Sequence, residues 1–171
     1  MAPSGIVSPV NLYLVAHGSA LPAEKDSERP LSEAGIAESS RLAQMVRSCG
    51  VRVQLLAHSS KTRSRQTAQI LLPAVHPGGR LTLWESLDPE DSPGHALKAI
   101  KKEKVDLLLV GHEPNLAKIA TRLLVPKKVP PLLSLSPGSL LWLQRQRTEE
   151  GKVWRLFGMF RAEALRAWER G

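Results

Sequence analysis

Two histidines and an arginine stand at positions where their side chains could together transfer a phosphoryl group. His17 and His112 each follow an apolar run and lie beside a glycine, and Arg63 lies shortly after a third apolar run. A neutral imidazole can attack phosphorus and form a phosphohistidine intermediate. A guanidinium binds phosphoryl oxygens well, because its planar fork donates two parallel hydrogen bonds. The chain therefore carries the side chains that a phosphoryl-transfer site needs.

The three apolar runs belong to a repeating order of strands and helices. Strands are predicted at residues 11–16, 51–57, 81–84 and 105–110, and helices at residues 33–49, 61–72, 91–103, 114–124 and 162–170. Such alternation favours a mainly parallel sheet with helices on both faces. Residues 140–145 and 153–160 alternate around a turn at 148–151, which predicts an antiparallel edge near the C-terminus. The predicted fold class is α/β.

Capping residues, glycine and proline set the predicted ends of the helices. Ser32 is the predicted N-cap of the first helix, and Gly50 ends that helix. Pro73 is predicted to end the second helix, because proline has no N–H to donate. Pro114 suits the first turn of the fourth helix. The residues 126–131 that follow predict a stiff, basic connection.

Polar residues follow three of the predicted strands. In an open α/β sheet, ligands bind outside the carboxyl ends of the strands. His17, His58 and His112 each come directly after a strand, and Arg63 and Arg65 lie just beyond the second of these strand ends. The start of the helix that carries Arg63 can add backbone N–H donors and a favourable dipole. We therefore expect the two histidines that lie beside a glycine, His17 and His112, to meet several cations at one edge of the sheet.

The composition predicts one globular domain whose partner carries negative charge. Its 171 residues suit a single domain, 1–171, with a flexible N-terminus over 1–10 and a helical extension over 161–171. The net charge of +8 favours an acidic partner such as phosphate or an acidic protein surface. Nucleic acid is disfavoured, because aromatic residues make up 4% of the chain and no zinc-finger spacing is present.

The sequence predicts a cytoplasmic protein with no membrane contact. The apolar runs are far shorter than the stretch of about 20 residues that a membrane span needs. The first eleven residues lack the basic patch and apolar core of a signal peptide. Cys49 is the single cysteine, so no internal disulfide can form, which fits a reducing compartment.

Four segments in collinear order between Leu12 and Leu124 resemble motifs of the histidine phosphatase superfamily. They are His17-Gly18, the pattern Ser59-x-x-x-Arg63-x-x-Gln66-Thr67-Ala68, the stretch Val110-Gly111-His112-Glu113-Pro114, and the pattern Asp26-x-x-Arg29-Pro30-Leu31-Ser32-x-x-Gly35. The last pattern is similar to a segment typical of the small SixA-type phosphohistidine phosphatases.

The resemblance implies a phosphoglycerate mutase-like fold and phosphatase activity without a metal or an organic cofactor. His17 matches the family's nucleophile, and Arg63 and His112 match the residues that bind the phosphoryl group and stabilise its transition state. Further candidates for phosphate contacts are Gly18, Ser19, Ser59 and Lys61. The expected occupant of the site is phosphate or a similar anion.

Position 16 departs from the family pattern, which has an arginine directly before the nucleophile. The residue here is Ala16, so one of two phosphate-binding forks is missing. Loss of such a donor typically costs about a hundredfold to a thousandfold in rate. Another cation substitutes, or the protein binds phosphate with little turnover, or the residue was changed deliberately. Lys61 is the candidate substitute, and its simpler interpretation is a solvated lysine at a helix start.

The predicted substrate is phosphohistidine in a phosphoprotein. Its P–N bond is labile and protonated imidazole leaves readily, and the segment 73–105 is too short for a large lid. Candidate acids for an alcohol leaving group are Glu85, Asp88, Glu90 and Asp91, although a charged loop is the simpler interpretation. Two alternatives remain open. One is a phosphomonoesterase for a small metabolite, and the other is a phosphate- or phosphoprotein-binding module weakened by Ala16.

Overall fold

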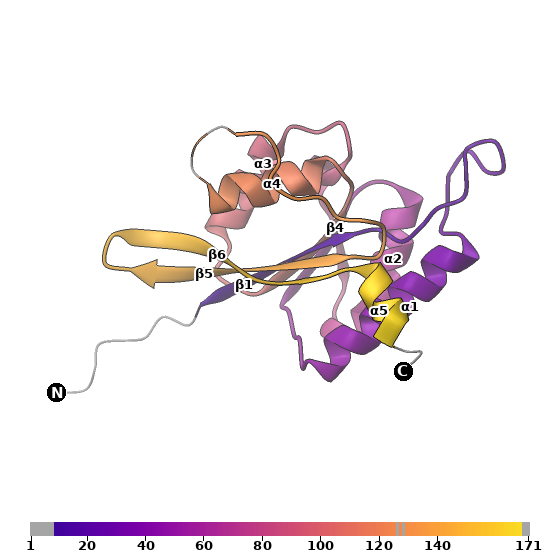
Figure 1. The fold of residues 1–171 in the computed structure, drawn as a ribbon, viewed down its shortest axis with the longest axis horizontal. Coiled ribbons are helices and arrows are strands. Elements are labelled where there is room, and N and C mark those ends of the chain that lie inside the picture. The colour runs from indigo at the N-terminus through magenta and orange to yellow at the C-terminus, as the bar shows by residue number, and fades with distance from the viewer. Residues whose placement is uncertain (1–8, 126, 128, 169–171) are drawn as a thin grey trace.

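The computed structural model describes residues 9–125, 127 and 129–168, and it shows a six-stranded sheet flanked by helices (Figure 1). The strands are β1 (Val10–Ala16), β2 (Leu55–His58), β3 (Leu81–Leu83), β4 (Leu107–Gly111), β5 (Leu140–Thr148) and β6 (Gly151–Phe160). The helices are α1 (Glu33–Ser48), α2 (Thr62–Val75), α3 (Pro93–Lys102), α4 (Asn115–Leu124) and α5 (Ala162–Trp168), with a short 3₁₀ helix, η1 (Glu85–Leu87).

The sheet has the strand order β3-β2-β4-β1-β5-β6. The first four of these strands pair in parallel, and β5 and β6 add an antiparallel hairpin beside β1. β1 and β4 lie at the centre and are apolar and almost entirely buried, as expected for strands covered on both faces. The predicted fold class is confirmed, including the antiparallel edge near the C-terminus.

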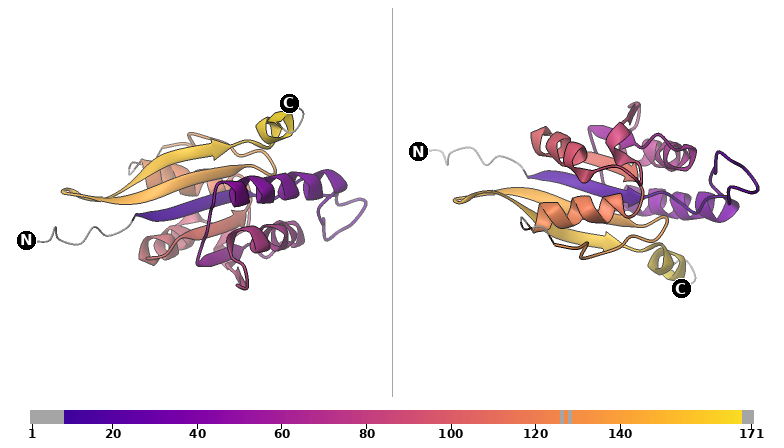
Figure 2. Two further views of the ribbon diagram at one scale, coloured as in Figure 1. Left: turned by 90° about the horizontal axis from the view of Figure 1, so that it is seen from below. Right: turned by 90° about the horizontal axis from the view of Figure 1, so that it is seen from above.

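Each face of the sheet carries its own apolar core. On one face, α3 and α4 bury side chains such as Ile100 and Ile119 against the sheet. On the other face, α1, α2 and α5 bury side chains such as Leu42, Leu71 and Leu165. Figure 2 shows α1 and α2 in front of the sheet in one view and α3 and α4 in front of it in the opposite view. The strand ends are therefore held rigidly between two packed layers.

β2 and α2 are among the elements whose boundaries differ from the predictions. β2 begins only at Leu55, because Val53 donates its N–H to Val75 of α2 rather than to a neighbouring strand. α2 continues through Pro73 to Val75, so the prediction that this proline ends the helix was wrong. Pro73 lies in the last turn, where its missing N–H costs one hydrogen bond and the two residues after it complete the helix.

Other predictions of the chain's organisation are confirmed within the described residues. Ser32 caps α1, its side chain accepting from the N–H of Gly35, and Gly50 follows the helix with a φ of 67°. Val10 is already part of β1, so the predicted flexible segment 1–10 is too long, and residues 1–8 lie outside the described residues. Among the described helices, none is long and apolar enough to cross a membrane.

Candidate active site

A cleft of about 990 Å³ opens at the carboxyl ends of β1, β2 and β4. His17, Arg63 and His112 all line it, so the fold brings together the three residues that the strand-end pattern predicts. Other lining residues come from two loops, Ser27 to Arg29 and Asp88 to Asp91. Parallel strands end at the same edge of a sheet, and this explains why residues nearly one hundred positions apart meet.

His17 is held in the tautomer that a nucleophile requires. Its Nδ1 lies 2.7 Å from the carbonyl oxygen of Gly18, and because a carbonyl only accepts, Nδ1 carries the proton. Nε2 therefore has a free lone pair, to which the Nε–H of Arg63 donates at 3.1 Å. The pKa of His17 is lowered to about 4, mainly by burial; the Gly18 hydrogen bond opposes this shift, and the charges of Arg63 and Arg29 add to it. The imidazole is neutral at physiological pH.

His112 lies beside His17, with the two ring centroids 4.6 Å apart. Its Nε2 is 2.6 Å from the Oγ of Ser59, and both side chains are buried. Burial, followed by the neighbouring His17 and Arg63, lowers the pKa of His112 to about 3. The Nδ1 atom is buried and has no hydrogen-bond partner among the described residues. Such an atom normally finds a partner in a ligand or water.

Close backbone contact fixes the turn that follows His17. A Cβ on Gly18 would lie 2.4 Å from the carbonyl oxygen of Gly35, and a Cβ on Gly35 would lie 1.9 Å from that of Ser19. Only glycine fits at either position. The N–H of Gly18 donates to Thr67 Oγ1 at 3.1 Å, and both N–H and Oγ of Ser19 donate to Glu38. Two groups predicted to contact phosphate are thus engaged with protein partners in this structure.

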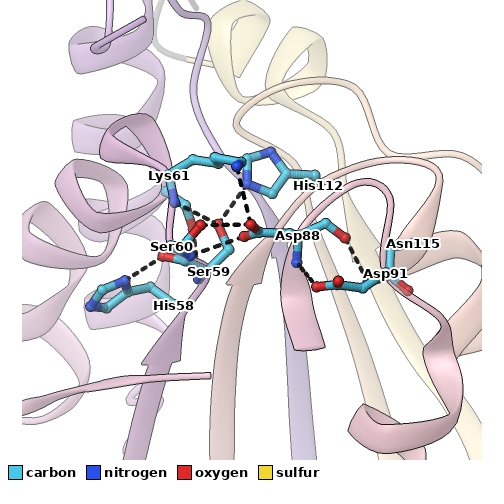
Figure 3. A network of polar contacts seen from close by, with 9 residues as sticks. His58, Ser59, Ser60, Lys61, Asp88, Asp91, His112 and Asn115 are labelled. Atoms are coloured by element: carbon cyan, nitrogen blue, oxygen red, sulfur yellow. Dashed lines mark hydrogen bonds and ion pairs between the residues drawn. The ribbon is translucent and has the colours of Figure 1, made fainter. Parts of the chain in front are cut away.

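A polar network lies around the carboxylate of Asp88 at the base of the cleft (Figure 3). Its Oδ1 accepts from the N–H of Ser60 at 3.0 Å, and its Oδ2 accepts from the Oγ of Ser60 at 2.6 Å. Lys61 Nζ forms an ion pair with Oδ2 at 3.2 Å. The predicted charged loop is therefore partly an ordered element of the site, and the cation of Lys61 has a protein partner. His58 points away from this group of side chains (Figure 3).

Arg29 is a cation in the cleft that the sequence analysis did not assign to the site. Its Nε–H donates to the carbonyl of Leu21 at 3.4 Å, and the side chain lines the cleft. The chain turns at Arg29 through a φ of 49°. The loop that carries it is closed at its base, because Leu21 donates to Pro30 and Ser32 donates to Ser19 through backbone groups. The one feature of the sequence that could have indicated a role for Arg29 in the site is its position in the segment that resembles SixA-type phosphatases.

Comparisons with known proteins give one curated relative and a group of solved structures with the same fold. No family model matches the chain. An uncharacterized protein of Picosynechococcus sp. is 30% identical over 118 residues, which cover 65% of this chain and 71% of the relative.

Several solved structures with the same fold are named as phosphatases. The protein histidine phosphatase SixA in complex with tungstate has a TM-score of 0.74 and 22% identity, and covers 91% of this chain and 99% of its own. SixA from Agrobacterium tumefaciens, assigned as a phosphohistidine phosphatase, has a TM-score of 0.68 and 25% identity over 90% of this chain and 98% of its own. A mycobacterial glucosyl-3-phosphoglycerate phosphatase has a TM-score of 0.68 and 16% identity over 89% of this chain and 99% of its own. With the four motifs in register and His17, Arg63 and His112 in one cleft, the chain resembles members of the histidine phosphatase superfamily in fold and in motif order.

Proposed function

We propose that this protein hydrolyses phosphohistidine in a phosphoprotein through a phosphorylated His17. The observation that carries the proposal is the geometry of His17 and Arg63. A neutral imidazole presents the lone pair of Nε2 to the cleft, and a guanidinium N–H lies 3.1 Å from that same atom. An arriving phosphoryl group would meet its nucleophile and a cation at one point.

The reaction has two balanced steps. In the first, Nε2 of His17 forms a bond to phosphorus while the P–N bond of the substrate breaks, and the leaving imidazole takes the electron pair of that bond and a proton from solvent. In the second, a water molecule attacks the phosphorus of phospho-His17, the Nε2–P bond breaks, and phosphate leaves with neutral His17 restored. The hydrogen bond from Nδ1 to Gly18 disperses the positive charge that the ring gains in the first step.

His112 supports this reaction as a hydrogen-bond donor. When the hydroxyl of Ser59 donates to Nε2, the proton of the neutral ring resides on Nδ1. That Nδ1 is buried and has no partner among the described residues, and a phosphoryl oxygen beside His17 would satisfy it. In this proposal Ser59 positions His112 rather than touching phosphate itself.

Arg29 is the best placed substitute for the arginine that Ala16 replaces. Both side chains line the same cleft, and the charge of Arg29 affects the pKa of His17 and of Arg63. Lys61, the substitute predicted from the sequence, lines the cleft too, but its Nζ is paired with Asp88 at 3.2 Å. A guanidinium also suits a phosphoryl group better than an ammonium, because it binds two oxygens at once.

The charges that line the cleft support a protein substrate over an anionic metabolite. The carboxylates of Glu28, Asp88, Glu90 and Asp91 line the cleft around its cations. A small substrate with a second anionic group would be repelled by them, whereas a phosphohistidine side chain brings a single phosphoryl group on a neutral ring. The SixA structure that the chain resembles is that of a protein histidine phosphatase. A metabolite phosphatase remains the second candidate, supported by the likeness to the glucosyl-3-phosphoglycerate enzyme.

The test is transfer of radiolabelled phosphate from a phosphohistidine protein. We expect rapid release of phosphate, label on the wild-type chain after an acid-free quench, and no label on a His17→Asn variant. Sugar phosphates and phosphoglycerate serve as competing substrates and should turn over far more slowly. Binding of the phosphoprotein without label or turnover would instead identify a binding module.

A further inference from the structure

The carboxylate of Asp88 joins two segments of the chain that meet at the base of the cleft. Both of its oxygens accept hydrogen bonds from Ser60, at 3.0 Å from the backbone N–H and 2.6 Å from the hydroxyl. Lys61 adds an ion pair at 3.2 Å. Ser60 and Lys61 immediately precede the first turn of α2, which carries Arg63. A bidentate contact of this kind fixes orientation as well as distance.

The segment that carries Asp88 is itself firmly anchored. Asn115 is buried, and its Nδ2 donates to the carbonyl oxygens of Ser86 at 3.1 Å and Asp88 at 3.0 Å. The N–H of Asp88 donates to Asp91 Oδ2 at 2.8 Å, and Leu87 is fully buried in the core. Figure 3 shows Asp88 between the Ser60–Lys61 pair on one side and the Asp91–Asn115 pair on the other. The carboxylate therefore projects from a rigid support.

We infer that Asp88 is a positioning residue that holds the start of α2 in place as a clamp. It thereby keeps Arg63 in hydrogen-bond contact with His17, and Ser59 in hydrogen-bond contact with His112. Ser59 precedes the clamped residue Ser60, and its Oγ lies 2.6 Å from His112 Nε2. Arg63 follows within one helical turn and donates to His17 Nε2 at 3.1 Å. One carboxylate thus sets the placement of Arg63, which faces the reacting phosphoryl group, and of Ser59, which positions His112. This inference rests on the proposed function, because its consequence is a rate of phosphoryl transfer.

The rival role for an acid at this place is donation of a proton to the leaving group. The contacts argue against it, because both carboxylate oxygens are already occupied as acceptors. Burial raises the pKa of Asp88, but the hydrogen bonds from Ser60 and Lys61 and the charge of Lys61 outweigh burial and lower it below its ordinary value. Asp88 is ionised at neutral pH and has no proton to give.

The experiment compares full-length wild type with Asp88→Asn on phosphate monoesters whose leaving groups differ widely in pKa, and on a phosphohistidine protein. We expect kcat to fall by about tenfold to a hundredfold. The factor should be the same for every substrate, since misplacement of a binding group slows the reaction of all of them alike. KM should change less than kcat. A loss confined to poor leaving groups would identify a proton donor and overturn the inference, and so would an unchanged kcat.

A matched control and a second variant make the result specific. Glu85→Gln changes an exposed carboxylate of the same loop that does not line this cleft, and should leave kcat unaltered. Ser60→Ala removes the 2.6 Å donor from an exposed position. Its effect should not add to that of Asp88→Asn if the two residues act as one clamp. Full additivity would contradict the clamp.

The proposed function and the inference can fail separately. If wild type turns over no phosphoester or phosphohistidine, the proposed function fails, and orthovanadate affinity then tests the clamp. Loss of the clamp should weaken vanadate binding by about tenfold or more. Tighter binding in Asp88→Asn, as simple removal of a negative charge predicts, would overturn the inference.

Discussion

The Nε–H of Arg63 donates to Nε2 of His17 at 3.1 Å, so the guanidinium lies against the very atom proposed to attack phosphorus. The contact requires a lone pair on Nε2, and it therefore reports the neutral tautomer directly. In a complex, the phosphoryl group would take the place between the two side chains. The pair thus places a nucleophile directly beside a positive charge before the phosphoryl group arrives.

Replacement of His17 by asparagine should abolish phosphoenzyme formation and lower kcat/KM on the order of 10⁴-fold or more, because the nucleophile is lost. The measurement is release of phosphate from a phosphohistidine protein, with mass spectrometry to locate the phosphoryl group. His95→Asn, an exposed histidine on α3, is the control and should behave as wild type. If the His17→Asn variant still became labelled, a residue other than His17 would be the nucleophile.

Arg63→Lys should lower kcat by about a hundredfold or more, since an ammonium keeps the charge but cannot bind two phosphoryl oxygens in parallel. The matched control is Arg65→Lys, which changes an exposed arginine two residues further along α2. Steady-state kinetics on one substrate suffice. Equal effects of the two substitutions would show that charge alone, rather than the fork of Arg63, is used.

Arg29→Ala should cost about a hundredfold in kcat/KM, and Ala16→Arg should restore much of that loss in the same chain. The expected rescue follows from both side chains lining one cleft. Lys25→Ala, exposed on the same loop, is the control. A large loss in Lys61→Ala with none in Arg29→Ala would assign the substitution to the lysine instead.

The activity should persist in moderately acidic solution. The pKa of His17 is lowered to about 4, so the nucleophile stays neutral until the pH falls through that value. The acidic limb of kcat/KM, which reports the free enzyme, should therefore have an apparent pKa near 4 rather than near the 6.5 of an ordinary histidine. A limb near 6.5 in a pH–rate profile would contradict the buried, neutral imidazole.

The free energy of unfolding should fall as the pH drops from 7 towards 5. In the unfolded chain His17 and His112 protonate near 6.5, whereas in the folded chain their pKa values are about 4 and about 3. The unfolded state therefore binds more protons in this window, and stability rises with pH across it. Urea denaturation at several pH values checks the slope. His17→Asn removes one of the two titrating groups and should flatten the slope, and an unchanged slope would refute the assignment.

Much of the fold followed from the sequence because burial leaves a clear pattern. The apolar runs that became β1 and β4 contain almost no polar residue, and only a strand covered on both faces tolerates that composition. β2 was predicted too long because Val51 and Val53 are buried without being paired in the sheet. Apolar composition reports burial, and it does not report which backbone groups pair.

The site was predictable where strand ends alone place the residues, as for His17 and His112. The position of Arg29 in the cleft and the contacts of Asp88, which the sequence offered only as a candidate acid, were not predictable, for different reasons. Arg29 reaches the cleft only because its loop turns through a φ of 49°, and a tertiary turn of this kind leaves no periodic signal. The partners of Asp88 lie 28 residues away in the chain, so its contacts depend on how two loops meet in space.

The loop that carries Arg29 is closed at its base, so changes at its tip need not disturb the turn that holds His17. Backbone hydrogen bonds from Leu21 to Pro30 and from Ser32 to Ser19 seal it, and the Gly18–Gly35 contact below holds the nucleophile's turn. Lengthening such a loop costs only about 0.6 kcal/mol for each doubling. Related sequences can therefore differ in the length of the loop tip, and so in the substrates that the cleft admits, while His17 keeps its position.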